Sequence, residues 1–366
     1  MTDLDRAIGR LIWVGIRGTG PSDPVFESEI ERCRRANAGG IILFDVDVPE
    51  RNRQRDLGLE EAEARLHAPR NIIDPDQTRS LVAAIRERLG PETVVMVDQE
   101  GGFVSRLNPA RGFAKSPAPR DFAMLGDSDR SQAAEELART VADAGFDLNL
   151  APCVDVAVNP DGPGHTALGR SFGRDPELVA SLAREQIDAM RARGVGGCLK
   201  HFPGHGSAVG DTHFGLVDIT ETWQESEELA PYRALMDHCG AVMISHLVHR
   251  GLDPDLPSSL SHSIVTGLLR DRLGFDGLVL TDSLDMRSIS DRFGTGESAV
   301  LALNAGVDVA LEANNLNEPK PCPAPELFGA IRQAVEDGDL SETRIHQSVA
   351  RLDAWRRTIR GAHASA

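Results

Sequence analysis

The chain has 366 residues, of which 41% are hydrophobic and 26% charged, a composition typical of globular proteins. Its 39 Lys and Arg against 56 Asp and Glu give a net charge of −17, which argues against nucleic acid or an anionic membrane surface as the main partner. No apolar run approaches the roughly 20 residues needed to cross a bilayer, and the acidic N-terminus lacks the pattern of a signal peptide.

Short β-branched runs alternate along the chain with longer helical stretches. Most of the runs are continuously apolar, as expected for parallel strands that are buried on both faces. In chain order, the eight predicted strands are 11–16, 40–44, 93–98, 147–152, 195–200, 241–246, 277–282 and 307–311. The helices predicted between them include 76–89, 131–144, 176–193, 222–238, 261–273 and 296–304.

The count of strands predicts the fold. Eight strands, each followed by a helix, indicate an α/β protein made of a single TIM-type (β/α)8 catalytic domain over residues 1–366. A doubly wound sheet is the competing architecture, but it needs neither eight strands nor the final helix predicted at 341–359. Residues 45–74 are charged and weakly periodic, which predicts an insertion after the second strand, partly helical at 60–67. The tail from about residue 361 is expected to be disordered.

Unusual polar residues follow the predicted strands, at the barrel face where active sites are built. The third strand ends at Asp98, the fifth at Lys200 and His201, the sixth at His246 and the seventh at Asp282. Taken singly, each has a structural explanation, such as a helix N-cap for Asp282. Taken together they favour a site, because caps need not face one cavity and buried charges are costly unless they are paired or bind a ligand.

The segment KHFPGHGSAVGDTHFGL, residues 200–216, is rich in histidine and glycine. Asp211 and His213 are two residues apart, so in extended backbone their side chains point the same way. Asp211 could then accept a hydrogen bond from one imidazole nitrogen and leave the other for proton transfer, while the glycines let the loop move over a pocket. A solvated loop with idle histidines is one alternative. A metal site is another, but it lacks a carboxylate ligand at standard spacing, and we expect neither metal nor cofactor.

These motifs resemble glycoside hydrolase family 3, and within it the β-N-acetylhexosaminidases of bacterial cell-wall recycling. KHFPGHG followed by D-x-H is the most specific match, and it is similar to the hexosaminidase branch rather than to the β-glucosidases of the family. The resemblance covers about residues 11–356. The matching segments are VDQEGG (97–102), LGRSFGRDP (168–176), KHFPGHG with DTH (200–213) and LGFDGLVLTDSLDM (273–286).

The resemblance implies a retaining exo-β-N-acetylglucosaminidase that hydrolyses terminal non-reducing N-acetylhexosamine residues of muropeptides or chitooligosaccharides. Asp282 matches the family's nucleophile, and His213 with Asp211 matches its general acid/base dyad. We expect Lys200 and other nearby cations to lower the pKa of Asp282. The positions that match the family's sugar-binding residues are Asp98, Arg106, Arg170, Lys200 and His201.

Other functions stay open at this point. The same fold could serve a β-N-acetylglucosaminide phosphorylase, since a neutral histidine repels phosphate less than a carboxylate would, or a β-glucosidase. A catalytically inactive sugar-binding barrel is the alternative outside enzymes, although pure binding needs no acid/base pair. Residues 159–166 are unusual for the family, and no role is assigned to His165.

Partners and location follow from composition. Five cysteines lie far apart without a CxxC pair, which predicts reduced, mostly buried thiols in a cytoplasmic protein. The expected partner is a small carbohydrate, with neither nucleic acid nor membrane, and the protein is expected to be a monomer or dimer.

Overall fold

Parallel strands line a central barrel in the computed structural model, which describes residues 2–162 and 166–363. The barrel strands are β1 (Ile12–Gly15), β2 (Gly40–Ile42), β3 (Val94–Val97), β6 (Leu148–Asn149), β7 (Gly196–Gly197), β8 (Leu199–Phe202), β9 (Ala241–Ile244), β10 (Leu278–Thr281) and β11 (Ala310–Glu312). Since β7 and β8 are separated by one residue, they occupy one of eight strand positions, as predicted. An antiparallel ribbon, β4 (Gln99–Gly101) with β5 (Val104–Ser105), follows β3.

The strands close into one ring. One sheet has the order β11-β1-β2-β3-β6-β7 and a second the order β10-β9-β8. The bridge Leu280↔Val309 joins β10 to the chain entering β11, and the bridge Cys153↔Lys200 joins the segment after β6 to β8. All pairs within the ring are parallel, so the predicted (β/α)8 barrel is confirmed.

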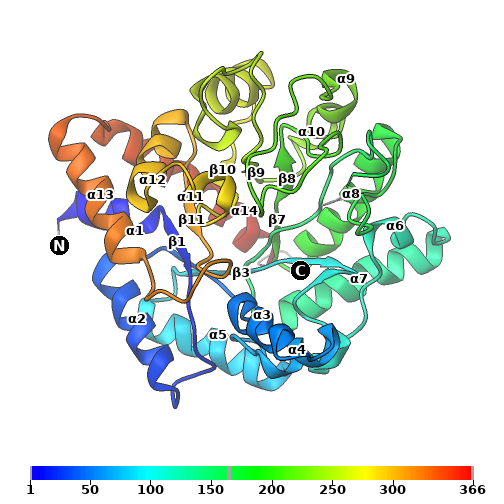
Figure 1. Ribbon diagram of the computed structural model, residues 1–366, viewed down its shortest axis with the longest axis horizontal. Coiled ribbons are helices and arrows are strands. Elements are labelled where there is room, and N and C mark those ends of the chain that lie inside the picture. The colour runs from blue at the N-terminus through cyan, green and yellow to red at the C-terminus, as the bar shows by residue number, and fades with distance from the viewer. Residues whose placement is uncertain (1, 163–165, 364–366) are drawn as a thin grey trace.

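Helices surround this ring (Figure 1). The α-helices are α1 (Asp3–Arg10), α2 (Pro24–Ala36), α3 (Val48–Asp56), α4 (Glu61–His67), α5 (Pro75–Leu89), α6 (Pro119–Phe122), α7 (Asp127–Asp143), α8 (Pro176–Ala192), α9 (Glu225–Glu228), α10 (Ala230–Leu235), α11 (Arg287–Ser290), α12 (Thr295–Ala305), α13 (Ala324–Asp337) and α14 (Glu342–His363). Short 3-10 turns are η1 (Pro109–Arg111) and η2 (Ser258–Leu260), and η3 (Ser263–Arg272) is a π-helix. Within residues 2–162 and 166–363, none of the helices combines the length and apolar character of a membrane span.

The helices differ from expectation in three places. The predicted helix 222–238 is divided into α9 and α10, because Pro231 in the first turn of α10 has no N–H with which to continue the preceding helix. The insertion contains the expected helix near 60–67 and also α3, which sequence periodicity missed because only Pro49 of α3 is buried. Helix α14 continues to His363, past the expected start of the tail, and residues 364–366 lie outside the described part.

The core has two layers, because successive side chains along a strand point to opposite faces. On β9, Val242 and Ile244 belong to the large cluster that also contains the residues of most helices. Ala241 and Met243 belong to a second cluster inside the ring. Helix α14 contributes Trp355 to this inner cluster, where its ring lies 6.3 Å from that of Trp13. The inner cluster therefore makes the barrel a packed support rather than a channel.

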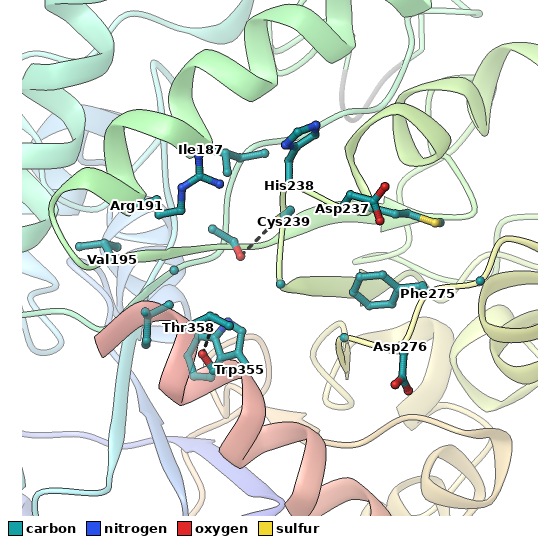
Figure 2. Close-up of a pocket in the computed structure, with 17 residues that line it drawn as sticks. Ile187, Arg191, Val195, Asp237, His238, Cys239, Phe275, Asp276, Trp355 and Thr358 are labelled. Atoms are coloured by element: carbon teal, nitrogen blue, oxygen red, sulfur yellow. Dashed lines mark hydrogen bonds between the residues drawn. The ribbon is translucent and has the colours of Figure 1, made fainter. Parts of the chain in front are cut away.

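A cavity of about 450 Å³ opens at the amino ends of the strands (Figure 2). It is lined by Gly240, which precedes β9, by Phe275 and by Trp355. A Cβ atom on Gly240 would lie 2.8 Å from the Trp355 ring, so glycine is needed for this close approach. The cavity is thus at the opposite end of the barrel from the strand ends where polar residues were predicted to gather.

Candidate active site

The predicted polar residues stand together at the carboxyl ends of the barrel strands. Asp98 directly follows β3, Lys200 lies within β8, and Asp282 directly follows β10. The N–H of Asp282 donates to the carbonyl of Ile244, the last residue of β9, at 2.8 Å. Because the strands are parallel, these segments meet at one end of the ring, as predicted from the sequence.

Asp282 is a half-buried carboxylate at this end. One of its oxygens, Oδ1, accepts the N–H of Ser283 at 2.7 Å. Burial acts to raise the pKa of Asp282, but the imidazoles of His201, His246 and His213 outweigh it, and the net shift is downward. The carboxylate therefore stays ionised at neutral pH.

Asp211 and His213 form the pair that their spacing predicted. Asp211 Oδ1 accepts both the backbone N–H of His213 at 2.9 Å and its ring Nδ1 at 2.7 Å. Burial opposes a charge on either group, but the contact dominates: the pKa of Asp211 falls to about 2 and the pKa of His213 rises. The charge of Asp282 also raises the pKa of His213. With Nδ1 held by Asp211, Nε2 is the nitrogen left to exchange a proton with a ligand.

The loop that carries this pair contacts the segment that follows Asp282. The N–H of Ser288, in α11, donates to the carbonyl of Thr212 at 3.4 Å. The imidazole of His213 is 41% exposed, so it reaches solvent while its neighbour Thr212 is buried. The structure thus brings together the Asp282 carboxylate and the His213 imidazole, from elements about 70 residues apart in sequence.

Lys200 lies between two carboxylates in the floor of the site. Its Nζ is 2.8 Å from Asp98 Oδ1 and 2.7 Å from Glu100 Oε1. Burial would lower the pKa of Lys200, but these two neighbours raise it. The expectation that Lys200 lowers the pKa of Asp282 needs correction, because Lys200 is neutralised by Asp98 and Glu100 and the imidazoles are the foremost groups that act on Asp282.

Arg170 and His201 belong to the same network. The Arg170 guanidinium makes a bidentate ion pair with Glu100, with Nε 2.9 Å and Nη2 2.7 Å from the carboxylate oxygens. Its Nη2 is also 3.3 Å from His201 Nε2. The other ring nitrogen of His201 lies 2.7 Å from Asp155 Oδ2. Of the predicted binding residues, Asp98, Lys200, Arg170 and His201 are therefore joined by direct contacts or through Glu100.

Arg106 lies at the edge of this network. Its N–H donates to the carbonyl of Asp98 at 3.3 Å. Its guanidinium lies 5.6 Å from the ring centre of Phe44 and 3.9 Å from Asp45 Oδ1. Arg106 Nε is buried with no hydrogen-bond partner among the described residues, so it retains a donor for a ligand.

The sequence prediction did not assign two residues that organise the site, Glu100 and Asp155, and it placed His246 at a strand end without giving it a role. Glu100 and Asp155 are nearly inaccessible carboxylates, and the cations they pair with hold the pKa of each below its usual range against the effect of burial. Buried His246 contacts the carbonyl of Ser283 through Nε2 at 2.9 Å, which holds the turn after Asp282. The sequence did contain a signal for each acid. Asp155 is an acidic residue within an apolar run, CVDVAV at 153–158, and Glu100 is a second acid two residues after Asp98.

One group of side chains has the composition of a metal site. Cys153, Asp155 and His201 offer ligand atoms within 4.8 Å of one another. The Asp155 carboxylate, however, already accepts the N–H groups of His201 and His205 and contacts His201 Nδ1 and Cys153 Sγ. These contacts explain the cluster as a support for His201.

Comparison with known proteins gives a family and its relatives. The model of the family "Glycosyl hydrolase family 3 N terminal domain" matches residues 25–354. A Beta-hexosaminidase of Chromobacterium violaceum is 34% identical over 320 residues, which cover 82% of this chain and 81% of that protein. Beta-hexosaminidase A of Pseudoalteromonas piscicida is 32% identical, and the match covers 70% of this chain and 46% of that longer protein.

Solved structures give the same result. A glycoside hydrolase family 3 beta-N-acetylglucosaminidase from Paenibacillus superposes with a TM-score of 0.83 at 31% identity, over 98% of this chain and 63% of that one. A Beta-N-acetylhexosaminidase from Beutenbergia cavernae has a TM-score of 0.81 at 27% identity, over 97% of this chain and 99% of that one. This chain thus spans less than two thirds of some relatives and nearly all of others.

Proposed function

Because this chain belongs to glycosyl hydrolase family 3, we propose that it is a retaining exo-β-N-acetylglucosaminidase that cleaves terminal N-acetylhexosamine residues from muropeptides or chitooligosaccharides. The names of its relatives support an N-acetylhexosamine as the sugar that is removed. The observation that carries the chemistry is the Asp211–His213 pair, whose loop contacts the segment that follows Asp282. The negative charge of Asp282 raises the pKa of His213.

In the proposed reaction the two groups act in two steps. The Asp282 carboxylate attacks the anomeric carbon, and the bond to the leaving oxygen breaks as His213 donates its proton to that oxygen. Neutral His213 then removes a proton from water, which attacks the anomeric carbon and releases Asp282. Two inversions give net retention. The raised pKa of His213 and the lowered pKa of Asp282 supply the two protonation states that the first step needs.

The remaining residues bind the sugar in this proposal. Asp98, Lys200 and His201 present charged or polar atoms at the strand ends, and Arg106 offers its unpartnered Nε. Arg170 is held rigid by its bidentate pair with Glu100. Hydroxyl and acetamido groups of a sugar are neutral, so donors and acceptors that are already fixed by ion pairs can bind them without reorganisation.

We expect a panel of aryl β-glycosides to separate the functional alternatives. The N-acetylglucosaminide should be hydrolysed at least about 100-fold faster than the glucoside, since a site built to bind the acetamido group rejects an analogue that lacks it. Phosphate should not change the rate or the product. A sugar 1-phosphate product would favour a phosphorylase, a preference for glucoside a β-glucosidase, and binding without turnover a sugar-binding barrel.

The acid/base role of His213 predicts a pH effect in Asp211→Asn. The carboxylate raises the pKa of His213, so its replacement by a neutral amide should lower that pKa while Oδ1 still accepts from Nδ1. His213 then loses its proton at lower pH, and the basic limb of the kcat/KM profile should move to lower pH. The control Asp237→Asn changes an exposed residue beside the cavity of Figure 2 and should leave the profile unchanged. An unmoved basic limb in Asp211→Asn would argue against His213 as the acid.

We also propose that the protein works in the cytoplasm, as a monomer or dimer, on fragments from cell-wall recycling. All five cysteines are free and buried, which suits a reducing compartment. Activity recovered in the cytoplasmic fraction of the source cells would support this location, and activity in the medium or a cell-envelope fraction would contradict it.

A further inference from the structure

Glu228, at the end of α9, is a fully buried carboxyl group that the proposed reaction does not use. Its Oε2 accepts the N–H of Gly206 at 3.0 Å and the N–H of Ser207 at 3.4 Å. Its Oε1 accepts the N–H of Gln224 at 3.4 Å. The side chain therefore joins α9 to the beginning of the loop that carries Asp211 and His213.

The same segment holds the loop at further points. The indole N–H of Trp223 donates to the carbonyl of Pro203 at 3.1 Å. Gly204 has φ +120°, and a Cβ atom there would lie 2.6 Å from Glu228 Cβ, so the backbone packs directly on this side chain. On the other side, Asp155 Oδ1 accepts the N–H of His205 at 2.8 Å. Residues 203–207 are thus fixed between two buried carboxyl groups.

Beyond this base the loop has fewer supports: Asn159 Nδ2 donates to the carbonyl of Ala208 at 3.2 Å, and the N–H of Ser288 donates to the carbonyl of Thr212 at 3.4 Å. Val209, Phe214 and Leu216 are 63%, 77% and 44% exposed, respectively. The chain is held again where Val248 donates to the carbonyl of Val217 at 2.9 Å. The projecting part, residues 208–216, contains Asp211 and His213, so the position of this pair depends on how the base is held as well as on the contact of Thr212 with Ser288.

We infer that Glu228 is a positioning residue: by accepting the N–H groups of Gly206 and Ser207, its carboxylate fixes the base of the loop and thereby sets where His213 stands relative to Asp282. The inference rests on the proposed function, since it assigns Glu228 a part in the same reaction. Glu228 acts through His213 and is not expected to touch the sugar.

The charge of Glu228 makes this role dependent on pH. Burial, with a further contribution from the negative charge of Asp155, raises the pKa of Glu228 to about 7. Three neighbouring groups keep their charge near this pH: Asp155 has a lowered pKa, buried Tyr232 a raised one, and His205 a pKa of about 4. Near neutral pH, Glu228 therefore passes from a carboxylate that accepts several N–H groups to an acid with a weaker hold on the loop.

Glu228→Gln tests the inference, because the amide keeps the shape of the side chain and resembles the protonated acid. With a β-N-acetylglucosaminide of a poor leaving group, such as chitobiose, kcat/KM of the variant should be about tenfold to 100-fold below wild type at about pH 8. The two proteins should converge at about pH 5.5, where wild-type Glu228 is also neutral. With a 2,4-dinitrophenyl leaving group the difference in kcat/KM should be small at both pH values, since this group departs without a proton from His213 and kcat/KM does not include the later attack of water.

The controls separate this inference from the proposed function. Glu227→Gln makes the same change one residue away on the same helix and should behave as wild type. If Glu228→Gln does not fold, as judged by circular dichroism, Gly204→Ala perturbs the same contact from the loop side and should show the same dependence on leaving group. A loss equal at all pH values and for both leaving groups, or no loss, would overturn the role of Glu228. A wild-type protein inactive on both substrates would instead overturn the proposed function.

Discussion

Asp282→Asn should abolish turnover of an aryl N-acetyl-β-glucosaminide, with a loss in kcat of at least about 10⁴-fold, while the fold is retained. The amide has the same shape, and its Oδ1 can still accept the N–H of Ser283. What is lost is the negative charge that three imidazoles stabilise and that the first step of the reaction uses as nucleophile. Steady-state rates and thermal unfolding would measure the two effects separately. Near-normal activity of the variant would remove the assignment.

Two further variants sharpen this test. Asp276→Asn makes the same change at the amino end of β10, where Asp276 is 89% exposed and pairs with Arg351 at the surface, and it should leave kcat unchanged. Asp282→Ala leaves space for a small anion, so azide should attack the anomeric carbon from the side of the missing carboxylate and give the α-glycosyl azide. A β-glycosyl azide would place the missing group on the opposite face and contradict a nucleophile at position 282.

Much of the barrel could be predicted because its signal is local. Segments such as 94–97 are continuously apolar and lie at the spacing of βα units, and each became a strand buried on both faces. The Asp211–His213 contact was predicted correctly, but the expected extended backbone was wrong: residues 212–214 form a turn, in which Asp211 Oδ1 accepts the N–H of His213 and the Asp211 carbonyl accepts the N–H of Phe214. Helix α3 could not be predicted, because its exposed, charged surface has no apolar stripe that would give a helical period.

The supports of the site could not be predicted, because they join residues far apart in sequence. Asp155 meets His201 after 46 residues, and Glu228 meets Gly206 after 22. In the sequence Glu228 is one of several acids in the run ESEE, which looks like a solvated helix face. Its side chain is buried by tertiary contacts with the loop, which include Gly204 and Gly206. The residues that touch a ligand carry motifs, whereas the residues that hold them in place are identified by tertiary contacts.

His213→Ala should have an effect that depends on the leaving group. If the imidazole donates a proton to the departing oxygen, its removal should lower kcat/KM for chitobiose by about 100-fold to 10,000-fold. A 2,4-dinitrophenolate departs without a proton, so kcat/KM for the corresponding glycoside should change little. A plot of log kcat/KM against leaving-group pKa should therefore be much steeper for the variant than for wild type.

The second step of the reaction tests the role of His213 independently. Without His213 no base activates water, so the glycosyl-enzyme should accumulate with the activated substrate and appear as a burst of phenol. Azide needs no base and should attack the intermediate from the face that water normally uses, giving the β-glycosyl azide. His346→Ala, which removes a 52% exposed histidine on α14, should show neither effect. Equal losses for good and poor leaving groups, with no burst, would assign His213 to binding instead of proton transfer.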